Sequence, residues 1–261
     1  MTGEIAITGV GGVHAPDPEA MPEVVRARAA RAERVTQLVI GAAGAALAMA
    51  GLDVTAGDPR PEVGVVLGTA LGCFLTNVAY QRRFVDGGAA AASPRLFAAT
   101  VSNAAAGELA IAYRLGGPAI TLTAGGVAGL VAIGHAVDLL RLRQADAFVA
   151  GGMDAAGEPL ERWIADGGLA LDGPVGEGAA TLVLEPVDHA RARGARVLGI
   201  VRDAAAGFEP GAAAARAPSA LAAAGVFEIL AALKDGAPRT THVLGRCPSG
   251  HVASIVVERS A

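Results

Sequence analysis

The sequence contains few of the residues that build metal and nucleic-acid sites. It has two cysteines among 261 residues, Cys73 and Cys247, and neither lies in a CxxC or Cys/His spacing. Zinc sites need several closely spaced ligands, so we expect no metal centre. Aromatic residues make up 3% of the chain and no basic stripe runs among them, which argues against nucleic acid as a partner.

Long apolar runs are also missing, although 52% of the residues are hydrophobic. The longest segment without an acidic or basic residue, 115–137, is interrupted by Gly116-Gly117-Pro118, whereas a membrane-spanning helix needs about 20 continuous apolar residues. The N-terminal region lacks the basic segment followed by an apolar one that marks a secretory signal. We therefore expect a cytoplasmic protein without a membrane span.

A dinucleotide-binding motif is incomplete. Gly9 and Gly11 follow an apolar run that begins at Ile5, but His14 stands where the third glycine of GxGxxG is required. We therefore expect no nucleotide cofactor and, since no other cofactor motif is present, no cofactor at all.

The nearest feature to a basic patch is a set of four arginines close to the N-terminus. Arg26, Arg28, Arg31 and Arg34 alternate with alanines and glutamates, and the net charge of the whole chain is −4. Mixed charges of this kind predict a solvated helix face. The alternative interpretation is a docking surface for an acidic carrier protein.

Apolar runs of β type alternate with helical patterns, and glycine or proline separates them. The patterns predict a strand at 5–12, helix 23–51, strand 62–69, helix 72–84, a loop at Ser93-Pro94, helix 104–115, strand 119–123, helix 128–143 and strand 146–150. They then predict strand 179–185, helix 187–193, strand 196–208, a linker at 211–218, helix 219–234 and strands at 241–245 and 253–258. The alternation predicts an α/β fold with a mostly parallel sheet covered on both faces.

Short motifs follow one another in a fixed order between residues 93 and 241. They are Ser93-Pro94, Asn103, Ala106-Gly107, Gly117-Pro118, Gly129, Gly134-His135-Ala136, Asp146, Ala150-Gly151-Gly152, Gly176 to Glu185, His189 to Arg196 and Ala222 to Thr241. Together they resemble a β-ketoacyl synthase. The resemblance implies a thiolase-like layered α-β-α fold with an abbreviated C-terminal half. It divides one compact domain into a ketosynthase-like N-terminal half, 1–185, and a shortened C-terminal half, 186–261.

In active members of this family a cysteine accepts the acyl chain. It sits at the amino end of a buried helix, where backbone amides and the helix dipole lower the pKa of its thiol. Counting from Pro118 to Gly129, the resemblance places this position at Gly126. Glycine offers no nucleophile, and neither Cys73 nor Cys247 belongs to this turn in the sequence. We therefore expect that the family mechanism of acylation fails and that the chain by itself is not an enzyme.

Two histidines complete the site of active members, and the resemblance places them in the segment that corresponds to 209–218. That segment contains no histidine. His135 matches a structural position of the helix after the nucleophile, and His251 matches the closing glycine-rich turn, where histidine is not the catalytic base. His242 and His14 fall in a strand and a loop without a partner pattern.

The resemblance is therefore to a chain-length factor, the inactive ketosynthase-like subunit of type II polyketide systems. It implies a heterodimer with an active ketosynthase, binding of a growing chain held on acyl carrier protein, and a role in shaping the tunnel that controls chain length. The best-known chain-length factors have glutamine at the nucleophile position and a full-length C-terminal half. With Gly126 and a shortened half, the chain is more similar to abbreviated partners in systems that make highly reduced or polyene chains.

The resemblance also implies which residues shape the tunnel and the interface. The start of the helix at 72–84 faces the acyl tunnel in the family. One side of this helix presents Leu71, Phe74 and Asn77 or Val78, although the same spacing is typical of ordinary core residues. The dimer interface is expected along an edge strand made of Ala119, Ile120, Thr121, Leu122 and Thr123.

Two other functions stay open at this point. One is a homodimeric pseudo-ketosynthase that serves only as a scaffold. The other is an acyltransferase with a non-cysteine nucleophile, for which Ser102, Thr121 and Thr123 are candidates. No GxSxG turn or Ser/His/Asp order supports the acyltransferase, and a hydroxyl without a base is a poor nucleophile. Co-purification with a full-length ketosynthase would distinguish the heterodimer from both.

Overall fold

The computed structural model describes residues 3–52, 57–209 and 218–260. The strands of these residues form one eight-stranded sheet in the order β3-β2-β4-β5-β1-β6-β8-β7. The strands are β1 (Ile5–Val13), β2 (Val63–Thr69), β3 (Ala119–Thr123), β4 (Ala147–Asp154), β5 (Gly178–Pro186), β6 (Gly199–Phe208), β7 (Thr240–Arg246) and β8 (His251–Arg259). Each predicted strand is present, and β4 continues beyond its predicted end at residue 150 to Asp154.

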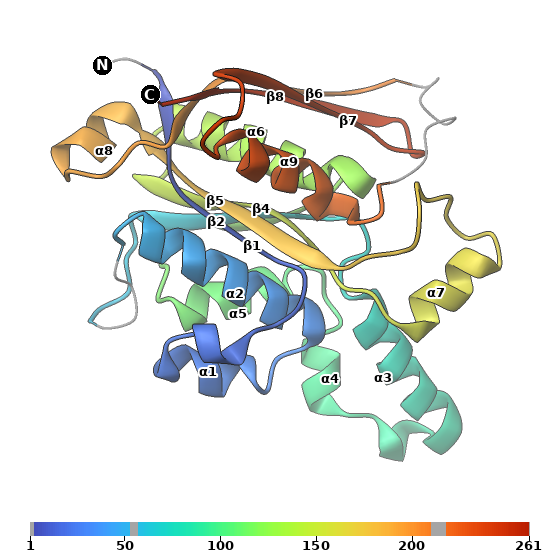
Figure 1. Ribbon diagram of the computed structural model, residues 1–261. Helices are drawn as coiled ribbons and strands as arrows, with labels where there is room; N and C mark the ends of the chain where they lie inside the picture. Colours follow the sequence, from blue (N-terminus) through green and yellow to red (C-terminus); the bar gives the residue numbers. More distant parts are fainter. Residues whose placement is uncertain (1–2, 53–56, 210–217, 261) are drawn as a thin grey trace.

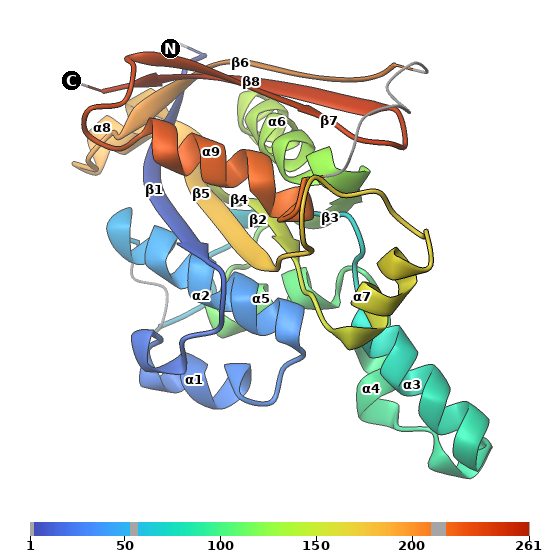
Figure 2. The same ribbon diagram turned by 45° about the vertical axis from the view of Figure 1, so that its right-hand side comes forward.

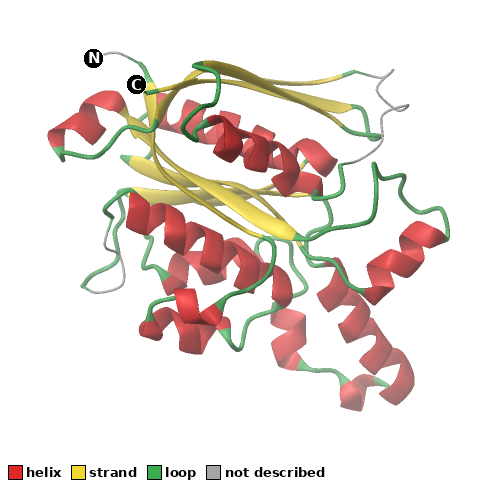
Figure 3. Cartoon of the chain, viewed as in Figure 1, coloured by secondary structure: helices red, strands yellow, loops and turns green. Residues whose placement is uncertain are grey.

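Helices cover the sheet in layers (Figure 1). They are α1 (Glu23–Ala29), α2 (Arg34–Met49), α3 (Phe74–Gly87), α4 (Pro94–Ala98), α5 (Ala104–Ala112), α6 (Ala128–Arg141), α7 (Glu158–Ala165), α8 (Val187–Ala192) and α9 (Ala224–Ala232). Helices α2 and α5 pack on one face of the sheet, with α1 outside them, and α6 and α9 pack on the other. Strands β6, β8 and β7 fold over α6 and α9, so that these two helices lie between the two parts of the sheet (Figure 3). The layered α/β fold expected from the resemblance is confirmed.

Glycine and alanine allow the backbone of α2 to lie directly on β1. A Cβ atom at Gly9 would come within 2.0 Å of the Ala46 carbonyl oxygen, and one at Gly11 within 2.0 Å of the Ala42 carbonyl oxygen. Real Cβ atoms do not approach backbone this closely, so both positions require glycine. The glycines of the incomplete nucleotide motif therefore serve helix-on-sheet packing. One face of the alanine-rich half of α2 is buried in the core, while Ala45, Ala48 and Met49 are exposed on the other.

The prediction of a mostly parallel sheet is wrong. Strand β2 runs parallel to β3 and β4, but the other neighbouring pairs among the described strands are antiparallel. The apolar pattern of a buried strand is the same for either direction, so the pattern alone does not determine how β5 returns beside β4. The parallel strands are confined to the part of the sheet that carries the candidate site.

Two helix boundaries also differ from the prediction. The helix expected at 23–51 is divided into two helices. Helix α1 ends at Ala29, Glu33 has an extended backbone conformation, and α2 begins at Arg34. The predicted loop at Ser93-Pro94 is instead the start of α4, where the Ser93 hydroxyl accepts a hydrogen bond from the Leu96 amide. Helix α7 was not predicted, and the predicted linker lies outside the described residues except for Pro218.

Helices α3 and α4 extend away from the sheet (Figure 2). Thr76 is the one buried residue of α3, and several large apolar side chains of this excursion face outward. Val85 is 76% exposed, Phe97 is 62% exposed and Phe84 is 45% exposed. None of the helices in the described parts of the chain is long and apolar enough to cross a membrane.

Candidate functional site

The turn that the resemblance assigns to the family nucleophile follows β3 and leads into α6 through the short 3-10 helix η3 (Gly125–Val127). The parallel strands β2, β3 and β4 all end at this edge of the sheet. Open α/β sheets bind their ligands at the carboxyl ends of their parallel strands. The loops at 70–73, 124–127 and 155–157 are therefore the place to look for a site.

Gly126 is buried, and the surrounding atoms leave little space for a side chain there. A Cβ atom on Gly126 would lie 2.9 Å from Pro218 Cδ and 3.9 Å from Cys247 Cβ. Both neighbours belong to the C-terminal half of the chain. Their positions explain why glycine is accommodated at this turn, and they could not be read from a local motif.

A second group of polar side chains reaches the same turn from the β7–β8 hairpin. The tip of the hairpin is closed by hydrogen bonds from the Gly250 amide to the Cys247 carbonyl (2.9 Å) and from the Cys247 amide to the His251 carbonyl (3.1 Å). A Cβ atom on Gly125 would lie 2.9 Å from Cys247 Sγ and 3.2 Å from Ser249 Oγ. Cys247 is remote from the turn in the sequence but packs against it in the fold.

The hairpin side chains form a hydrogen-bonded row. Cys247 Sγ lies 2.9 Å from Ser249 Oγ, and Ser249 Oγ lies 2.9 Å from His251 Nδ1. The rings of His251 and Phe208 form a T-shaped pair with centroids 5.6 Å apart. Sequence reasoning assigned no role to Ser249 and found no partner for His251; the alternation of residues 247, 249 and 251 in a hairpin is the signal that could have suggested their contact.

Asp154 connects the two sides of the site. Its buried carboxylate accepts hydrogen bonds from the Thr69 hydroxyl (2.7 Å), the Leu71 amide (2.9 Å) and the Ala222 amide (3.0 Å). Burial raises the pKa of Asp154, and these hydrogen bonds oppose that shift. Asp154 thereby holds the loop before α3 against the 3-10 helix η5 (Leu221–Ala223), and sequence reasoning missed this residue.

Three of the four predicted tunnel residues lie together on α3. Phe74, Asn77 and Val78 line one shallow groove of about 370 Å³, which continues along the helix to Val85. Leu71 is placed differently, since it packs with the buried Leu171 and Leu221.

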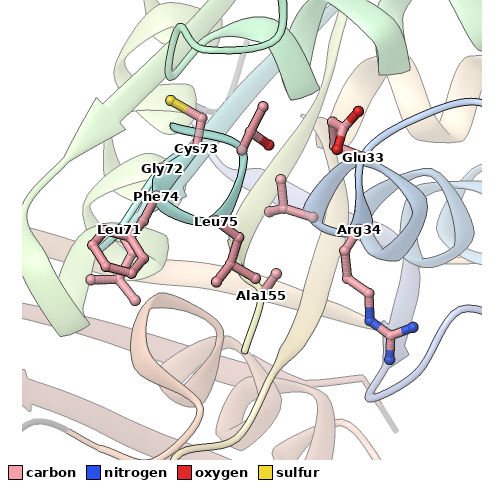
Figure 4. A pocket seen from close by; sticks show the side chains of 10 residues that line it. Glu33, Arg34, Leu71, Gly72, Cys73, Phe74, Leu75 and Ala155 are labelled. Atoms are coloured by element: carbon pink, nitrogen blue, oxygen red, sulfur yellow. The ribbon is translucent and has the colours of Figure 1, made fainter. Parts of the chain in front are cut away.

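Phe74 borders both the groove on α3 and a second, smaller cavity, which Leu71 also lines (Figure 4). That cavity has a volume of about 80 Å³. Cys73 borders it as well, and its thiol donates to the Thr100 carbonyl oxygen at 2.8 Å.

The predicted interface residues form β3, which pairs with β2 on one side only. Ala119 and Thr123 are exposed, and the three residues between them are half-buried. The Val65 amide donates to the Pro118 carbonyl oxygen at 2.8 Å. Backbone N–H groups of successive residues in a strand point to opposite sides, so the amides of Ala119, Thr121 and Thr123 point away from β2. The outer edge of β3 is therefore free in the described part of the chain.

The hydroxyls named as alternative nucleophiles have no base. Ser102, Thr121 and Thr123 make no hydrogen bond to an imidazole or a carboxylate within the described residues. The Thr121 hydroxyl is buried without any partner. Of the remaining histidines, His14 stacks on Phe227 with ring centroids 4.2 Å apart, and His242 is exposed on β7.

The N-terminal arginines do not share one helix, because α1 ends before Arg31. Arg28 pairs with Glu108 at 2.5 Å, and Arg34 pairs with Glu177. A groove of about 470 Å³ lies between α1, α4 and α5, and its lining includes Arg28, Arg31 and Arg95. Two glutamates, Glu33 and Glu108, line the same groove, so three arginines face two acidic residues there.

A model of the β-ketoacyl synthase N-terminal domain matches residues 8–165, which is more than half of the chain. The chain belongs to the β-ketoacyl synthase family. The matched region begins within β1 and contains β2, β3, β4 and the turn at Gly126. The C-terminal strands that enclose this turn lie outside it.

Relatives of this chain are named as 3-oxoacyl-[acyl-carrier-protein] synthases and as polyketide β-ketoacyl synthases. The 3-oxoacyl-[acyl-carrier-protein] synthase 2 of Vibrio harveyi is 33% identical over 171 residues, which cover 58% of this chain and 41% of the relative. The tetracenomycin polyketide synthase ketoacyl synthase alpha subunit of Streptomyces glaucescens is 32% identical over 195 residues, or 65% of this chain and 46% of the relative. This ketosynthase-like chain thus spans less than half the length of these relatives.

Solved structures share the fold over the whole chain. The ishigamide ketosynthase/chain length factor aligns with a TM-score of 0.78 and 20% identity, covering 99% of this chain and 100% of the other. A type II polyketide acyl-carrier protein in complex with its ketosynthase bound to the hexaketide aligns with a TM-score of 0.83 and 18% identity, covering 98% and 99%. At this identity the likeness establishes the thiolase-like fold alone.

Proposed function

We propose that this chain is a chain-length-factor-like subunit that does not itself catalyse condensation and that pairs with an active ketosynthase. The observation that carries the proposal is the turn at Gly126, where the family places its nucleophile. The residue there has no side chain, and Pro218 lies 2.9 Å from the place where a Cβ atom would project. The absence of a histidine from residues 209–218 supports the same conclusion.

The groove on α3 supports a role in chain length. Phe74, Asn77 and Val78 present an apolar surface that the chain itself leaves uncovered. When a partner subunit packs against α3, such a surface becomes one wall of a closed cavity. The size of Phe74 then limits the length of an acyl chain that enters from the partner, because further methylenes in a filled cavity cost about 1–3 kcal/mol.

The free edge of β3 and the apolar excursion of α3 and α4 support pairing with a second subunit. A strand edge with unpaired amides is a template for another strand. Val85, Phe97 and Phe84 are exposed on the excursion, as are Val101 and Ile111 nearby. Interfaces of obligate subunits are apolar and commonly exceed about 2,000 Å².

The groove lined by Arg28, Arg31 and Arg95 supports binding of an acyl carrier protein that holds the growing chain. Carrier domains that are acidic are attracted to such a patch. Arg28 and Arg95 already pair with Glu108 and Glu33, so Arg31, whose guanidinium donates to the Ala27 carbonyl oxygen, is the arginine of the groove best placed to meet a new anion.

Co-expression with a full-length ketosynthase from the same gene neighbourhood tests the proposal. We expect the two chains to co-purify as a 1:1 complex whose mass is measured by light scattering, and the chain alone to aggregate or self-associate. A well-behaved monomer with no affinity for the ketosynthase would contradict the proposal. A stable homodimer that ignores the ketosynthase would instead favour the scaffold function.

The acyltransferase alternative gains one specific observation. The hydroxyls predicted from the sequence have no base, but Ser249 has one in His251. This hydroxyl is the subject of the next inference.

A further inference from the structure

We propose that Ser249 is an acyl-accepting hydroxyl, with His251 as its base, placed beside the turn where the family carries its cysteine. This inference goes beyond the proposed function and does not depend on a heterodimer. It concerns one covalent step on an acyl thioester, and no condensation follows from it.

The first argument is the position of the hydroxyl. Ser249 Oγ would be 3.2 Å from a Cβ atom on Gly125, the residue directly before the family nucleophile position. Gly125 has a φ of +58°, and glycine at 125 and 126 leaves the hairpin room to approach this turn. The Ser249 hydroxyl of the hairpin thus lies close to the position where the family carries its cysteine nucleophile.

The second argument is the hydrogen-bond row around the hydroxyl. Ser249 Oγ is 2.9 Å from His251 Nδ1, which is within the range required of a nucleophile and its base. With the proton of the neutral ring on Nε2, Nδ1 accepts the serine proton. Cys247 Sγ is 2.9 Å from the same oxygen on its other side. Its thiol proton is directed at the Ala124 carbonyl oxygen, and sulfur is a weak acceptor, so the serine hydroxyl donates to the stronger acceptor, His251 Nδ1.

The third argument is access, which selects serine over cysteine. Ser249 is exposed and His251 is half-buried, whereas Cys247 is 1% exposed and lies beneath the serine against the Ala124 carbonyl oxygen. An incoming thioester therefore meets the hydroxyl first. Cys247 acts as a positioning residue.

The step balances without a further reactant. The Ser249 hydroxyl proton passes to His251 Nδ1 while Oγ attacks the carbonyl carbon of the acyl thioester. The carbon–sulfur bond then breaks, and the departing thiolate takes the proton from His251. The products are an acyl ester on Ser249 and a free thiol.

Incubation of the purified chain with the octanoyl thioester of N-acetylcysteamine tests the proposal. We expect a single octanoyl adduct by intact-mass measurement, mapped by peptide sequencing to Ser249. Mild treatment with a neutral thiol removes an adduct from cysteine but leaves a serine ester in place, so this treatment separates Ser249 from Cys247 and Cys73.

Substitutions test the roles of Ser249 and His251 separately. Ser249→Ala should abolish the adduct, and His251→Ala should slow its formation by about 100-fold or more, the usual cost of removing a general base. Ser249→Cys should react faster, which keeps the test valid if the alanine variant folds poorly. Ser102→Ala and His242→Ala are matched controls that should leave the rate unchanged.

The proposal is overturned if the wild-type chain gains no adduct, if the adduct persists in Ser249→Ala, or if it maps to a cysteine. It is also overturned if His251→Ala reacts at the wild-type rate. These outcomes do not affect the test of the proposed function, because complex formation with a ketosynthase is measured without any thioester.

Discussion

At the scale of single residues, Gly126 is the position proposed to have lost the family nucleophile, and it is also a position with little space for a side chain. We expect Gly126→Cys to lower the free energy of unfolding by about 1–3 kcal/mol, because the new Cβ atom would lie 2.9 Å from Pro218 Cδ and forces the proline to move. Urea unfolding followed by circular dichroism measures the change. We also expect no condensation activity from this variant, because the proposed function includes the loss of both family histidines and a thiol alone does not replace them.

Gly134 provides the matched control within α6. A Cβ atom there would have Ala204 Cβ, at 3.6 Å, as its nearest neighbour, which is an ordinary contact. Gly134→Ala should therefore raise stability by up to about 1 kcal/mol through helix propensity. Equal destabilisation by both substitutions would contradict the packing argument at Gly126.

Glu185 is a buried carboxylate that makes stability depend on pH. Burial raises its pKa, but hydrogen bonds from Arg193 (2.5 Å), Thr8 (2.5 Å) and His189 (2.7 Å) together outweigh burial and hold the pKa of Glu185 below its ordinary value. A carboxyl with a lowered folded-state pKa adds stability above its unfolded pKa, about 4.3. That stability is lost as the pH falls through the lower, folded-state pKa.

We expect Glu185→Gln to lower the free energy of unfolding at pH 7 by about 3 kcal/mol, since it leaves the Arg193 guanidinium without its charge partner. The variant should also lose less stability than the wild type between pH 6 and pH 3. Glu108→Gln, which breaks an ion pair whose side chains are 39% and 40% exposed, should cost no more than about 1 kcal/mol. Thermal unfolding at several pH values distinguishes Glu185→Gln from Glu108→Gln. If the stability of the wild type and of Glu185→Gln changed with pH in the same way, the role of Glu185 would be refuted.

At the scale of elements, α3 is a helix whose apolar side the chain does not cover. In the reconstituted complex with a ketosynthase, we expect Phe74→Ala to lengthen the polyketide product by one or more extension units, because it removes the large side chain that closes the cavity. A relief of about 1.4 kcal/mol changes the ratio of extension to release about tenfold. Mass spectrometry of the released products measures the length.

Val85→Ala is the control for this experiment. Val85 lies farther along the same groove, three turns from Phe74, and is 76% exposed. The Val85→Ala substitution should leave the length of the product unchanged. If Phe74→Ala forms a stable complex that makes the wild-type product, then Phe74 contributes only to packing, for example against Trp163, whose ring centroid lies 6.0 Å away.

At the scale of the whole molecule, the edge of β3 offers a direct test of assembly. The Thr121 amide points away from β2, so Thr121→Pro removes a donor that only a partner strand could use. We expect the affinity for the ketosynthase to fall tenfold or more while the chain still folds. Ile120→Pro removes an amide directed toward β2 and should instead destabilise the chain itself. Light scattering and circular dichroism separate the two effects; unchanged assembly by Thr121→Pro would exclude the β3 edge as the interface.

The local sequence determined the features that depend on residue identity and short-range pattern. Strand β3 occupies the predicted 119–123, and the family is identified from motifs that can be read in order along the sequence. These features follow from turn residues, apolar periodicity and motif spacing, which act within a few residues of the chain.

The tertiary structure decided everything that joins distant segments. It set the antiparallel return of β5, placed Pro218 and Cys247 over Gly126, and brought Ser249 and His251 to the turn after β3. No local pattern contains this information, because an apolar residue is buried equally well by any neighbour of suitable shape. Which neighbour it meets depends on how the whole chain packs its layers, and only the assembled fold settles that choice.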